Sequence, residues 1–438
     1  MQFKVSQGKG LRGDITIPGD KSISHRAVML ASLAEGKSKI SGLLEGEDCL
    51  ATVEVFKKLG VSISKEKEEY IVEGKGLQGL NEPISPLDFG NSGTSVRLCT
   101  GLLAAQEFSS TLIGDSSLSS RPMRRIIDPL SLMGADIAGS EDGTLPLKIQ
   151  PSDSLKPITY SLPVASAQVK SCLMFASLYA KGVTELEEKV LTRDHTERMF
   201  KQFNIPLEIN RFKESNLIKV ENVEYIAPQD INICGDFSSA SFFILAALIT
   251  PDSEILIRNV GINPSRIGFL HALRHMGANI ELQKTGGSVE PTANIIAKTS
   301  DLKGITLNTN LVANMIDEMP AFFIAASLAD GVTKVTDAKE LRTKESDRLQ
   351  VMSEALNSFG VKFRLEKDGI LINGLGKEGT FNGAKIDSHG DHRIAMASSI
   401  GSLRSDSETI ISDCLNVDTS FPNFIEVCKE VGIEIESI

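Results

Sequence analysis

The sequence predicts a mixed α/β fold of two domains, each built from three copies of one repeat. The first observation is length, because 438 residues are too many for a single hydrophobic core. The second is a recurring segment, in which small polar or charged residues lead into an Ala-rich apolar helix. Such segments start near Lys21, Asn91, Ser166, Asp236, Asp317 and Asp391. Two landmarks recurring in the same order indicate an internal repeat.

The second landmark is the end of a later helix in each repeat. These ends are Leu59-Gly60-Val61, Met133-Gly134-Ala135, Phe203-Asn204-Ile205, Met276-Gly277-Ala278, Phe359-Gly360-Val361 and Val431-Gly432-Ile433. Gly and Asn best tolerate the left-handed conformation that follows a helix. A short strand is expected after each first helix, most clearly at Glu254–Ile257. Each repeat therefore reads strand, helix, strand, helix and a strand pair.

The boundary between the two domains is predicted after Cys234-Gly235, where three repeats give way to three more. The residues up to about Asp20 form a strand, Ile15–Pro18, that fits either half. The sequence alone leaves this assignment open.

Composition excludes some classes of partner. A net charge of −11 and a pI of about 5.2 argue against nucleic acid or an anionic membrane surface. The six cysteines are scattered without CxxC spacing and sit mostly in apolar runs, which favours reduced core thiols. No signal-peptide region and no membrane-spanning apolar run are found, so a cytoplasmic protein is expected.

The strongest candidate for a binding site is Gly19–Arg26, where a strand, a tight turn and a helix start meet. Free N–H groups and the positive end of the helix dipole lie in the first turn of a helix. Lys21, Ser22 and Arg26 add cations and a hydroxyl, which suits phosphate or carboxylate. A capped helix with solvated charges is the alternative.

The next two repeats add further polar helix starts. Gly93 allows backbone amides to approach a ligand closely, and Arg121 precedes a Pro suited to the first position of a helix. In the third repeat, Ser166 and Gln168 can bind hydroxyls or phosphate oxygens, and Arg193 is available nearby. Glu197 and Arg198 are expected to form ion pairs on a helix surface.

The last three repeats differ in their polar residues, and the fifth contains the best acid–base candidates. Asp236 is expected to cap a helix, and a cap is also the alternative reading of Asp317. Lys344 and Arg348 share one face if their run is helical, and the adjacent Glu345 and Lys344 can shift each other's pKa. Arg393 opens the last repeat; the nearby Asp387–His392 cluster lacks the further ligands of a metal site.

These motifs, in this order, resemble the EPSP synthase family (3-phosphoshikimate 1-carboxyvinyltransferases) over essentially the whole chain. The resemblance rests on Gly19–Arg26, Asn91–Thr94, Arg121–Met123, Lys344–Arg348 and Gly390–Arg393. It implies a two-domain inverse α/β barrel with three βαβαββ units in each domain. It also implies that residues 1–20 and 235–438 form the domain with both termini, and residues 21–234 the other.

The implied reaction belongs to the shikimate pathway of aromatic amino-acid biosynthesis. It transfers the enolpyruvyl group of phosphoenolpyruvate to the 5-hydroxyl of shikimate 3-phosphate and releases phosphate. By resemblance, shikimate 3-phosphate is bound by Lys21, Ser22, Arg26, Ser166, Ala167, Gln168, Arg193, Asp317 and Lys344. Phosphoenolpyruvate is bound by Lys21, Gly93, Arg121, Gln168, Lys344, Arg348 and Arg393. The implied catalytic residues are Asp317, Glu345, Lys344 and Lys21, with Asp317 as the base.

The resemblance implies no metal or organic cofactor, a monomer, and no nucleic-acid or membrane partner. One departure concerns Thr419, which stands where many members of the family carry a phosphoenolpyruvate-binding Lys. Together with Arg193–Glu197 it resembles the second class of the family, some of whose members tolerate glyphosate. Two alternatives remain: the related transferase that acts on UDP-N-acetylglucosamine, and a non-catalytic scaffold of repeats.

Overall fold

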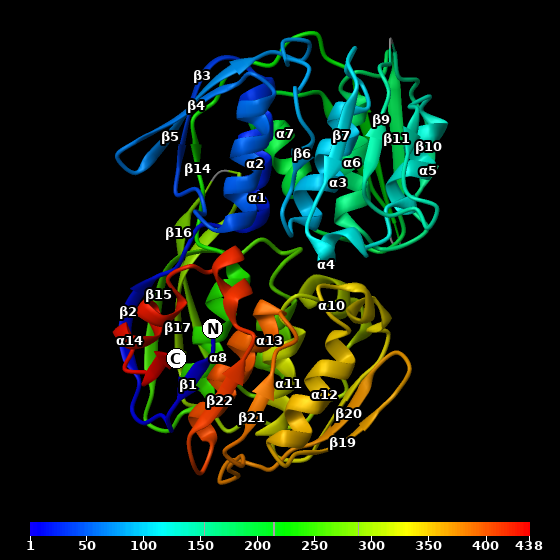
Figure 1. Cartoon of the computed structure of the whole chain (residues 1–438). Coiled ribbons are helices and arrows are strands. Elements are labelled where there is room, and N and C mark those ends of the chain that lie inside the picture. The colour runs from blue at the N-terminus through cyan, green and yellow to red at the C-terminus, as the bar shows by residue number, and fades with distance from the viewer. Residues whose placement is uncertain (153, 213–214, 288) are drawn as a thin grey trace. The chain divides into compact units, whose positions relative to one another are not determined.

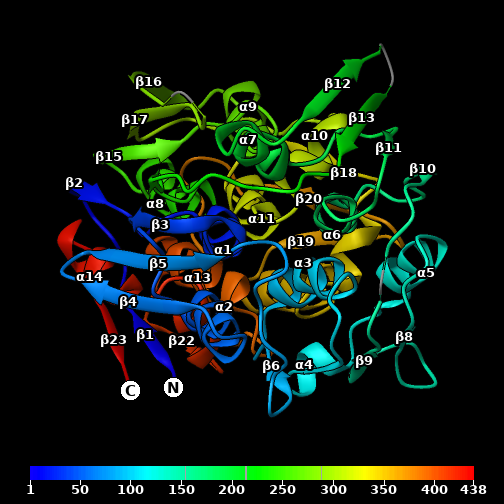
Figure 2. The ribbon, with the colours of Figure 1, turned by 90° about the horizontal axis from the view of Figure 1, so that it is seen from above.

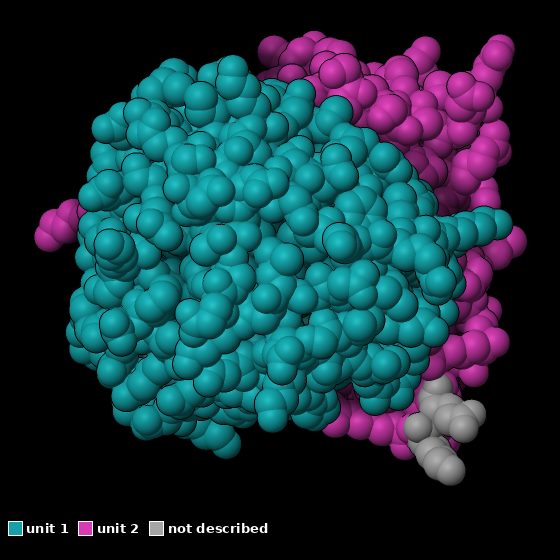
Figure 3. All heavy atoms as spheres, turned by 90° about the horizontal axis from the view of Figure 1, so that it is seen from below, with its two compact units in different colours: residues 1–18, 234–438 teal, residues 19–233 magenta. Residues whose placement is uncertain are grey.

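The chain forms two compact units in this computed structural model, which describes residues 1–152, 154–212, 215–287 and 289–438. Unit 1 consists of residues 1–18 and 234–438, and unit 2 of residues 19–233 (Figure 3). Both chain ends lie in unit 1, where strand β1 (Phe3–Val5) pairs antiparallel with β23 (Ile435–Ser437). None of the described helices is long and apolar enough to cross a membrane.

Unit 2 contains three copies of the predicted repeat. The first consists of β14 (Ile231–Asn232), α1 (Lys21–Leu33), β3 (Glu35–Ser41), α2 (Glu47–Lys58), β4 (Ser62–Glu66) and β5 (Glu69–Lys75). The second consists of β6 (Leu87–Asp88), α3 (Gly93–Leu103), β7 (Ser110–Ile113), α4 (Ser116–Ser119), α5 (Arg124–Leu132), β8 (Ile137–Ala138) and β9 (Leu147–Ile149). The third consists of β10 (Thr159–Ser161), α6 (Ala167–Ser177), β11 (Val183–Glu188), α7 (His195–Gln202), β12 (Leu207–Arg211) and β13 (Asn216–Glu221).

Unit 1 contains the other three copies. The fourth consists of β2 (Arg12–Thr16), α8 (Phe237–Ile249), β15 (Glu254–Gly261), α9 (Gly268–His275), β16 (Asn279–Gly286) and β17 (Thr292–Lys298). The fifth consists of α10 (Thr309–Val312), η1 (Ala313–Met315), α11 (Met319–Ser327), β18 (Val332–Val335), η2 (Lys339–Thr343), α12 (Arg348–Ser358), β19 (Lys362–Leu365) and β20 (Ile370–Asn373). The sixth consists of β21 (Lys385–Asp387), α13 (His392–Gly401), η3 (Ser402–Arg404), β22 (Thr409–Ser412), η4 (Leu415–Thr419), α14 (Phe424–Glu430), β23 and β1.

Each repeat has its own small sheet, and the described strands form six sheets, none of them a closed barrel. Five of the sheets have four strands. In each of them the first strand of the repeat pairs parallel with the second, and the other two pairs of neighbouring strands are antiparallel. The antiparallel neighbours β3, β5 and β4 lie side by side in Figure 2. In the fifth repeat the first strand is reduced to two isolated parallel bridges, Lys303 with Asp330 and Thr306 with Lys334.

Two strands are exchanged between the units. Strand β2 directly precedes α1 in the chain, but it pairs with β15 of the fourth repeat. Strand β14 directly precedes α8, but it pairs with β3 of the first repeat. The chain therefore passes between the units twice, after Pro18 and after Ile233.

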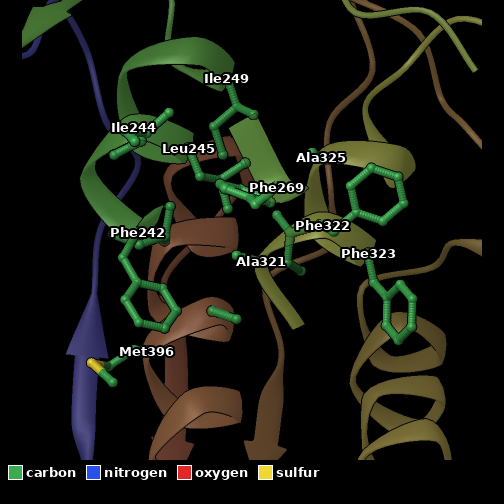
Figure 4. Close-up of a cluster of buried hydrophobic side chains, with 14 of the residues drawn as sticks. Phe242, Ile244, Leu245, Ile249, Phe269, Ala321, Phe322, Phe323, Ala325 and Met396 are labelled. Atoms are coloured by element: carbon green, nitrogen blue, oxygen red, sulfur yellow. The ribbon is translucent and has the colours of Figure 1, made fainter. Parts of the chain in front are cut away.

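The first helices of the repeats form the inside of each unit. Every residue of α8, α11 and α13 is buried, and these helices contact one another. Phe242 and Leu245 of α8, Ala321 of α11 and Met396 of α13 meet in one apolar cluster (Figure 4). Figure 1 shows β15 and β17 on one side of these helices and β19 and β20 on the other. A helix that is apolar all round must be buried in this way.

The second helices end as the sequence predicts. The residue two positions after the end of each helix has a positive φ angle, namely 89° at Gly60, 98° at Gly134, 56° at Asn204, 93° at Gly277, 80° at Gly360 and 87° at Gly432. A side chain with a β carbon strains this conformation, which explains why five of the six residues are Gly.

Candidate active site

The first candidate residues of unit 2 lie at the start of α1. Asp20 caps this helix by accepting a hydrogen bond from the backbone N–H of Ile23 at 2.9 Å. The Nζ of Lys21 forms an ion pair with Oδ2 of Asp48, whose side chain is buried on α2. Lys21 is therefore held in place and is not a solvated surface charge.

Arg26 is buried and held on three sides. Its Nη1 donates to the carbonyl oxygen of Ser22 at 2.8 Å, one turn earlier in the same helix. Its Nη2 donates to Oγ of Ser171 on α6 at 2.8 Å, and its Nε donates to Oγ1 of Thr196 on α7 at 2.7 Å. One guanidinium thus links three helices of unit 2.

A second group surrounds Gly93, the first residue of α3. A β carbon added to Gly93 would lie 2.8 Å from Nη1 of Arg97 and 2.9 Å from Nη1 of Arg121. Nη1 of Arg97 also donates to Oε1 of Gln168 at 2.8 Å, and Nε2 of Gln168 donates to Oγ1 of Thr94 at 3.0 Å. Two guanidiniums and an amide therefore meet beside the N–H groups that open α3, an arrangement suited to an anion.

His25 connects the two groups. Its Nδ1 is 2.7 Å from Oγ1 of Thr52, and its Nε2 is 3.3 Å from Oγ of Ser92, the cap of α3. Burial, followed by the positive charges of Lys21 and Arg26, lowers the pKa of His25 well below 6.5. The imidazole is therefore neutral at pH 7 and serves as a hydrogen-bonding link between α1 and α3.

The remaining candidates of unit 2 lie at the starts of α6 and α7. Ser166 caps α6 through the N–H of Val169, and Ala167 is the first residue of that helix. Arg193 lies in the loop before α7, directly after Thr192. The prediction of a surface ion pair for Glu197 is wrong, because Glu197 is buried and pairs with Lys170. Arg198 does form the predicted surface pair, with Asp194 at 2.8 Å.

Arg348 is the centre of the candidate site in unit 1. This side chain is 0% exposed and begins α12. Its Nε donates to Oδ2 of Asp391 at 2.8 Å, its Nη1 to Oδ1 of Asp317 at 3.1 Å, and its Nη2 to Oε2 of Glu345. Burial alone lowers the pKa of Arg348, but the carboxylates, with Asp391 foremost, raise it overall. The permanently charged guanidinium of Arg348 thus connects Asp317, the predicted base, to Glu345.

Asp317 does not cap α11, because the capping position belongs to Glu318. Its partly exposed side chain also lies 3.9 Å from Nε of Arg393, and its carbonyl oxygen accepts from Nη1 of Arg393 at 3.2 Å. Arg393 is buried in the first turn of α13, whose cap is Asp391. Asp317 and Arg393 are therefore neighbours, as the prediction of a shared site requires.

Lys344 lies between η2 and α12. The run from Glu340 to Arg348 is not one helix, so Lys344 and Arg348 do not share a helix face. Nζ of Lys344 is 4.0 Å from Oε1 of Glu340. Burial lowers the pKa of Lys344, although Asp317 and Glu340 act in the opposite direction. A lysine with a lowered pKa gives up its proton more readily.

Two other expectations for unit 1 have clear outcomes. Asp236 caps α8, as predicted, by accepting from the N–H of Ser238 at 2.8 Å, and it also pairs with the buried Arg266. Thr419 is buried at the end of η4, where its hydroxyl donates to the carbonyl oxygen of Asn416 at 2.7 Å.

Three residues at these sites were missed by the sequence analysis: Asp48, Arg97 and Asp391 as a partner of Arg348. The position of Arg97 could have been predicted from the sequence, because it lies four residues after Gly93 and thus on the same helix face. Asp48 and Asp391 reach their cations only through tertiary packing. Among the described residues, no group of three or more His, Cys, Asp or Glu side chains could hold a metal ion.

Comparison with known proteins identifies the family. The model of the EPSP synthase family (3-phosphoshikimate 1-carboxyvinyltransferase) matches residues 5–428. The chain belongs to the EPSP synthase family. A 3-phosphoshikimate 1-carboxyvinyltransferase of Methylococcus capsulatus is 48% identical, with 99% of this chain and 98% of that protein covered. That of Hydrogenovibrio crunogenus is 46% identical, with 100% and 99% covered.

Solved structures agree with this assignment to the EPSP synthase family. An EPSP synthase from Acinetobacter baumannii has a TM-score of 0.87 and 44% sequence identity, and the match covers 100% of both chains. The predicted fold class, two inside-out α/β domains, is confirmed by this likeness. The predicted family and its class of reaction, transfer of a carboxyvinyl group, are confirmed as well.

Proposed function

We propose that this chain transfers the enolpyruvyl group of phosphoenolpyruvate to the 5-hydroxyl of shikimate 3-phosphate. A bond forms between the hydroxyl oxygen and C2 of phosphoenolpyruvate, the bond from C2 to the phosphate oxygen breaks, and phosphate leaves. The observation that carries the proposal is the match of the family over residues 5–428. The two units correspond in this proposal to the two domains of the family.

In unit 2, the proposed ligands of shikimate 3-phosphate are Lys21, Ser22, Arg26, Ser166, Ala167, Gln168 and Arg193. The proposed ligands of phosphoenolpyruvate are Lys21, Gly93, Arg121 and Gln168. Both substrates carry a phosphate and a carboxylate, which explains the cations at the starts of α1 and α3. The closeness of Gly93 to the guanidinium of Arg121 supports their joint use, since both would face the same anion.

In unit 1, Asp317 accepts the proton of the attacking hydroxyl, while Glu345 and Lys344 move protons at the methylene carbon and the leaving phosphate. The lowered pKa of Lys344 supports its part, because a weaker base is a better proton donor. Asp317 and Lys344 also contact shikimate 3-phosphate, and Lys344, Arg348 and Arg393 bind phosphoenolpyruvate. The link through Arg348 supports a role in fixing the Asp317 and Glu345 carboxylates for proton transfer.

The test is phosphate release with phosphoenolpyruvate and either shikimate 3-phosphate or UDP-N-acetylglucosamine as acceptor. We expect turnover with the first acceptor only; turnover with the nucleotide sugar alone would replace our proposal. Asp317→Ala, Glu345→Ala and Lys21→Ala should each fold and lose about 100-fold or more in kcat. Glu366→Ala, at a surface carboxylate of the same unit as Asp317, should keep wild-type turnover. Normal turnover in all three site variants would refute the catalytic roles assigned to these residues, and absence of turnover in the wild type with either acceptor would favour the non-catalytic scaffold.

The finer properties are also proposals. We expect a cytoplasmic monomer that uses no metal or organic cofactor and has no nucleic-acid or membrane partner. Light scattering on the purified protein tests the monomer, and turnover in the presence of a chelator tests the independence from metals. Calorimetric titration should show that shikimate 3-phosphate binds unaided, and the same titration with glyphosate added would establish inhibitor binding.

A further inference from the structure

Unit 2 contains a buried cluster of charges for which the proposed reaction has no direct use. The side chain of Lys170, on α6, is 0% exposed, and those of Glu188 and Glu197 are 2% and 3% exposed. Nζ of Lys170 is 2.8 Å from Oε1 of Glu188 and 2.7 Å from Oε1 of Glu197. Apolar residues of similar volume often stabilise a core as well as or better than a buried ion pair. A cluster of this kind therefore points to a requirement for defined geometry.

The cluster ties a loop to the core. Glu188 ends β11, and residues 189–194 lead from there to α7. Oε1 of Glu188 accepts hydrogen bonds from the backbone N–H of Thr192 at 2.8 Å and from its hydroxyl. Val190 and Leu191 between them are half exposed, so Thr192 is where the loop is anchored. The next residue is Arg193, a proposed ligand of shikimate 3-phosphate.

The cluster also sets the distance between α6 and α7. Ser171 follows Lys170 on α6, and Thr196 precedes Glu197 on α7. Their hydroxyl oxygens are 2.6 Å apart, and each accepts a hydrogen bond from the guanidinium of Arg26. The ion pair between Lys170 and Glu197 therefore fixes, one residue away on each helix, the hydroxyl pair that orients Arg26.

We propose that Lys170, with Glu188 and Glu197, is a positioning residue for shikimate 3-phosphate. It fixes the loop before α7 and the pair of hydroxyls, so that Arg193 and Arg26 are held where the phosphorylated substrate binds. It does not touch the substrate. The inference rests on the proposed function, because it concerns the same site.

The two neighbouring carboxylates keep Lys170 protonated. Burial alone lowers the pKa of Lys170, but Glu197 and Glu188 raise it overall, so its ammonium group stays charged. Burial raises the pKa of Glu197, and Lys170 opposes that rise.

The test compares Lys170→Met with wild type by steady-state kinetics and by calorimetric titration with shikimate 3-phosphate. Methionine has similar length and no charge. We expect the Kd for shikimate 3-phosphate to rise about 10- to 100-fold, because small displacements of binding groups have effects of this size. The KM for phosphoenolpyruvate should change less than about 2-fold. Lys219→Met removes a lysine whose side chain is 32% exposed and which pairs with Glu185 in the same unit, and it should change neither constant.

A comparison of combined variants separates positioning from simple loss of stability. If Lys170 acts through Arg26 and Arg193, adding Lys170→Met to a variant that carries both Arg26→Lys and Arg193→Lys should weaken binding less than about 2-fold further. Multiplication of the two effects would overturn the inference. Should Lys170→Met not fold, Glu197→Gln keeps the acceptor atom without its charge, and an unchanged Kd in that variant would also overturn it. Failure of the wild type to release phosphate would instead refute the proposed function.

Discussion

Replacing Arg348 by Met tests how unit 1 holds its carboxylates together. The guanidinium contacts Asp391, Asp317 and Glu345 and has no exposed surface. Methionine fills a similar volume but provides no hydrogen-bond donor. The variant therefore leaves the fully buried Asp391 without its main cation, and Asp317 and Glu345 lose a partner as well.

The size of the effect follows from the burial of these groups. Removing one member of a buried ion pair costs about 3–5 kcal/mol, because the remaining charge stays buried without compensation. In a domain of 150–250 residues, each kcal/mol lowers the melting temperature by about 2–4 °C. Unit 1 of Arg348→Met should therefore melt about 6–20 °C below wild type. Adding Asp391→Asn removes the stranded charge and should restore part of the loss.

The assay is thermal unfolding combined with amide hydrogen exchange, which reports on each unit separately. Protection should fall at the starts of α12 and α13 and stay unchanged in unit 2. The matched control is Arg364→Met, which breaks an ion pair with Glu366 whose side chains are 71% and 31% exposed, and it should change stability by less than about 1 kcal/mol. Equal melting temperatures for Arg348→Met and Arg364→Met would refute the argument.

Three further predictions concern His25, Gly101 and Phe381. Burial lowers the pKa of His25 well below 6.5, so the unfolded chain takes up a proton that the folded chain rejects. The contribution of His25 to the free energy of unfolding is therefore fully present above about pH 6.5, and it falls by up to about 1.4 kcal/mol per pH unit below that pH. In acid unfolding, His25→Gln should remove this contribution to the pH dependence of stability. Gly101→Ala places a β carbon 2.1 Å from the carbonyl oxygen of Cys172 and should cost about 1–3 kcal/mol in urea unfolding, with an unchanged midpoint contradicting this. Phe381→Ala removes a ring stacked on Phe359 at 4.7 Å and should cost about 3–5 kcal/mol in the same assay, far more than truncation of an exposed side chain.

Local patterns in the sequence predict the repeats and the ends of their helices well. Helices α8 and α11 are apolar on nearly all faces, and the second helices stop at Gly or Asn with positive φ angles. Both features depend on residues within a few positions of one another. Caps such as Asp236 and Ser166 belong to the same class, because the bond is made to a residue two or three positions later.

The exchange of β2 and β14 lies outside what local patterns can determine. These strands have five and two residues, and each leads directly into the helix of a repeat to whose sheet it does not belong. The alternation of residues along a strand fixes which face is buried but does not fix its partner. Only the packing of the complete units decides between the two sheets.

The sequence suggests candidate residues for the site, but it does not predict the hydrogen bonds and ion pairs that these residues make with one another. A helical run up to Arg348 would place Lys344 and Arg348 on one face, but the helix begins only at Arg348. Asp347 caps it by accepting from the N–H of Gln350. The Ser346-Asp347 pair is a capping signal that would have located this start. The contact of Arg348 with Asp391, 43 residues later, depends on the meeting of two helix starts and has no local signal.

The residues at the capping positions of the inner helices differ in charge between the two units. The partial positive charge at a helix start attracts anions. In unit 1 the residues at the three capping positions are acidic, namely Asp236, Glu318 and Asp391, although the Glu318 side chain accepts no capping hydrogen bond. Each of the three lies beside Arg266 or Arg348. In unit 2 two of the three are serines, Ser92 and Ser166, and only Asp20 is acidic. We infer that the helix starts of unit 2 keep more of their attraction for substrate anions. In unit 1 the starts of α8 and α13 already have a capping carboxylate that accepts from the backbone, so they attract further anions less.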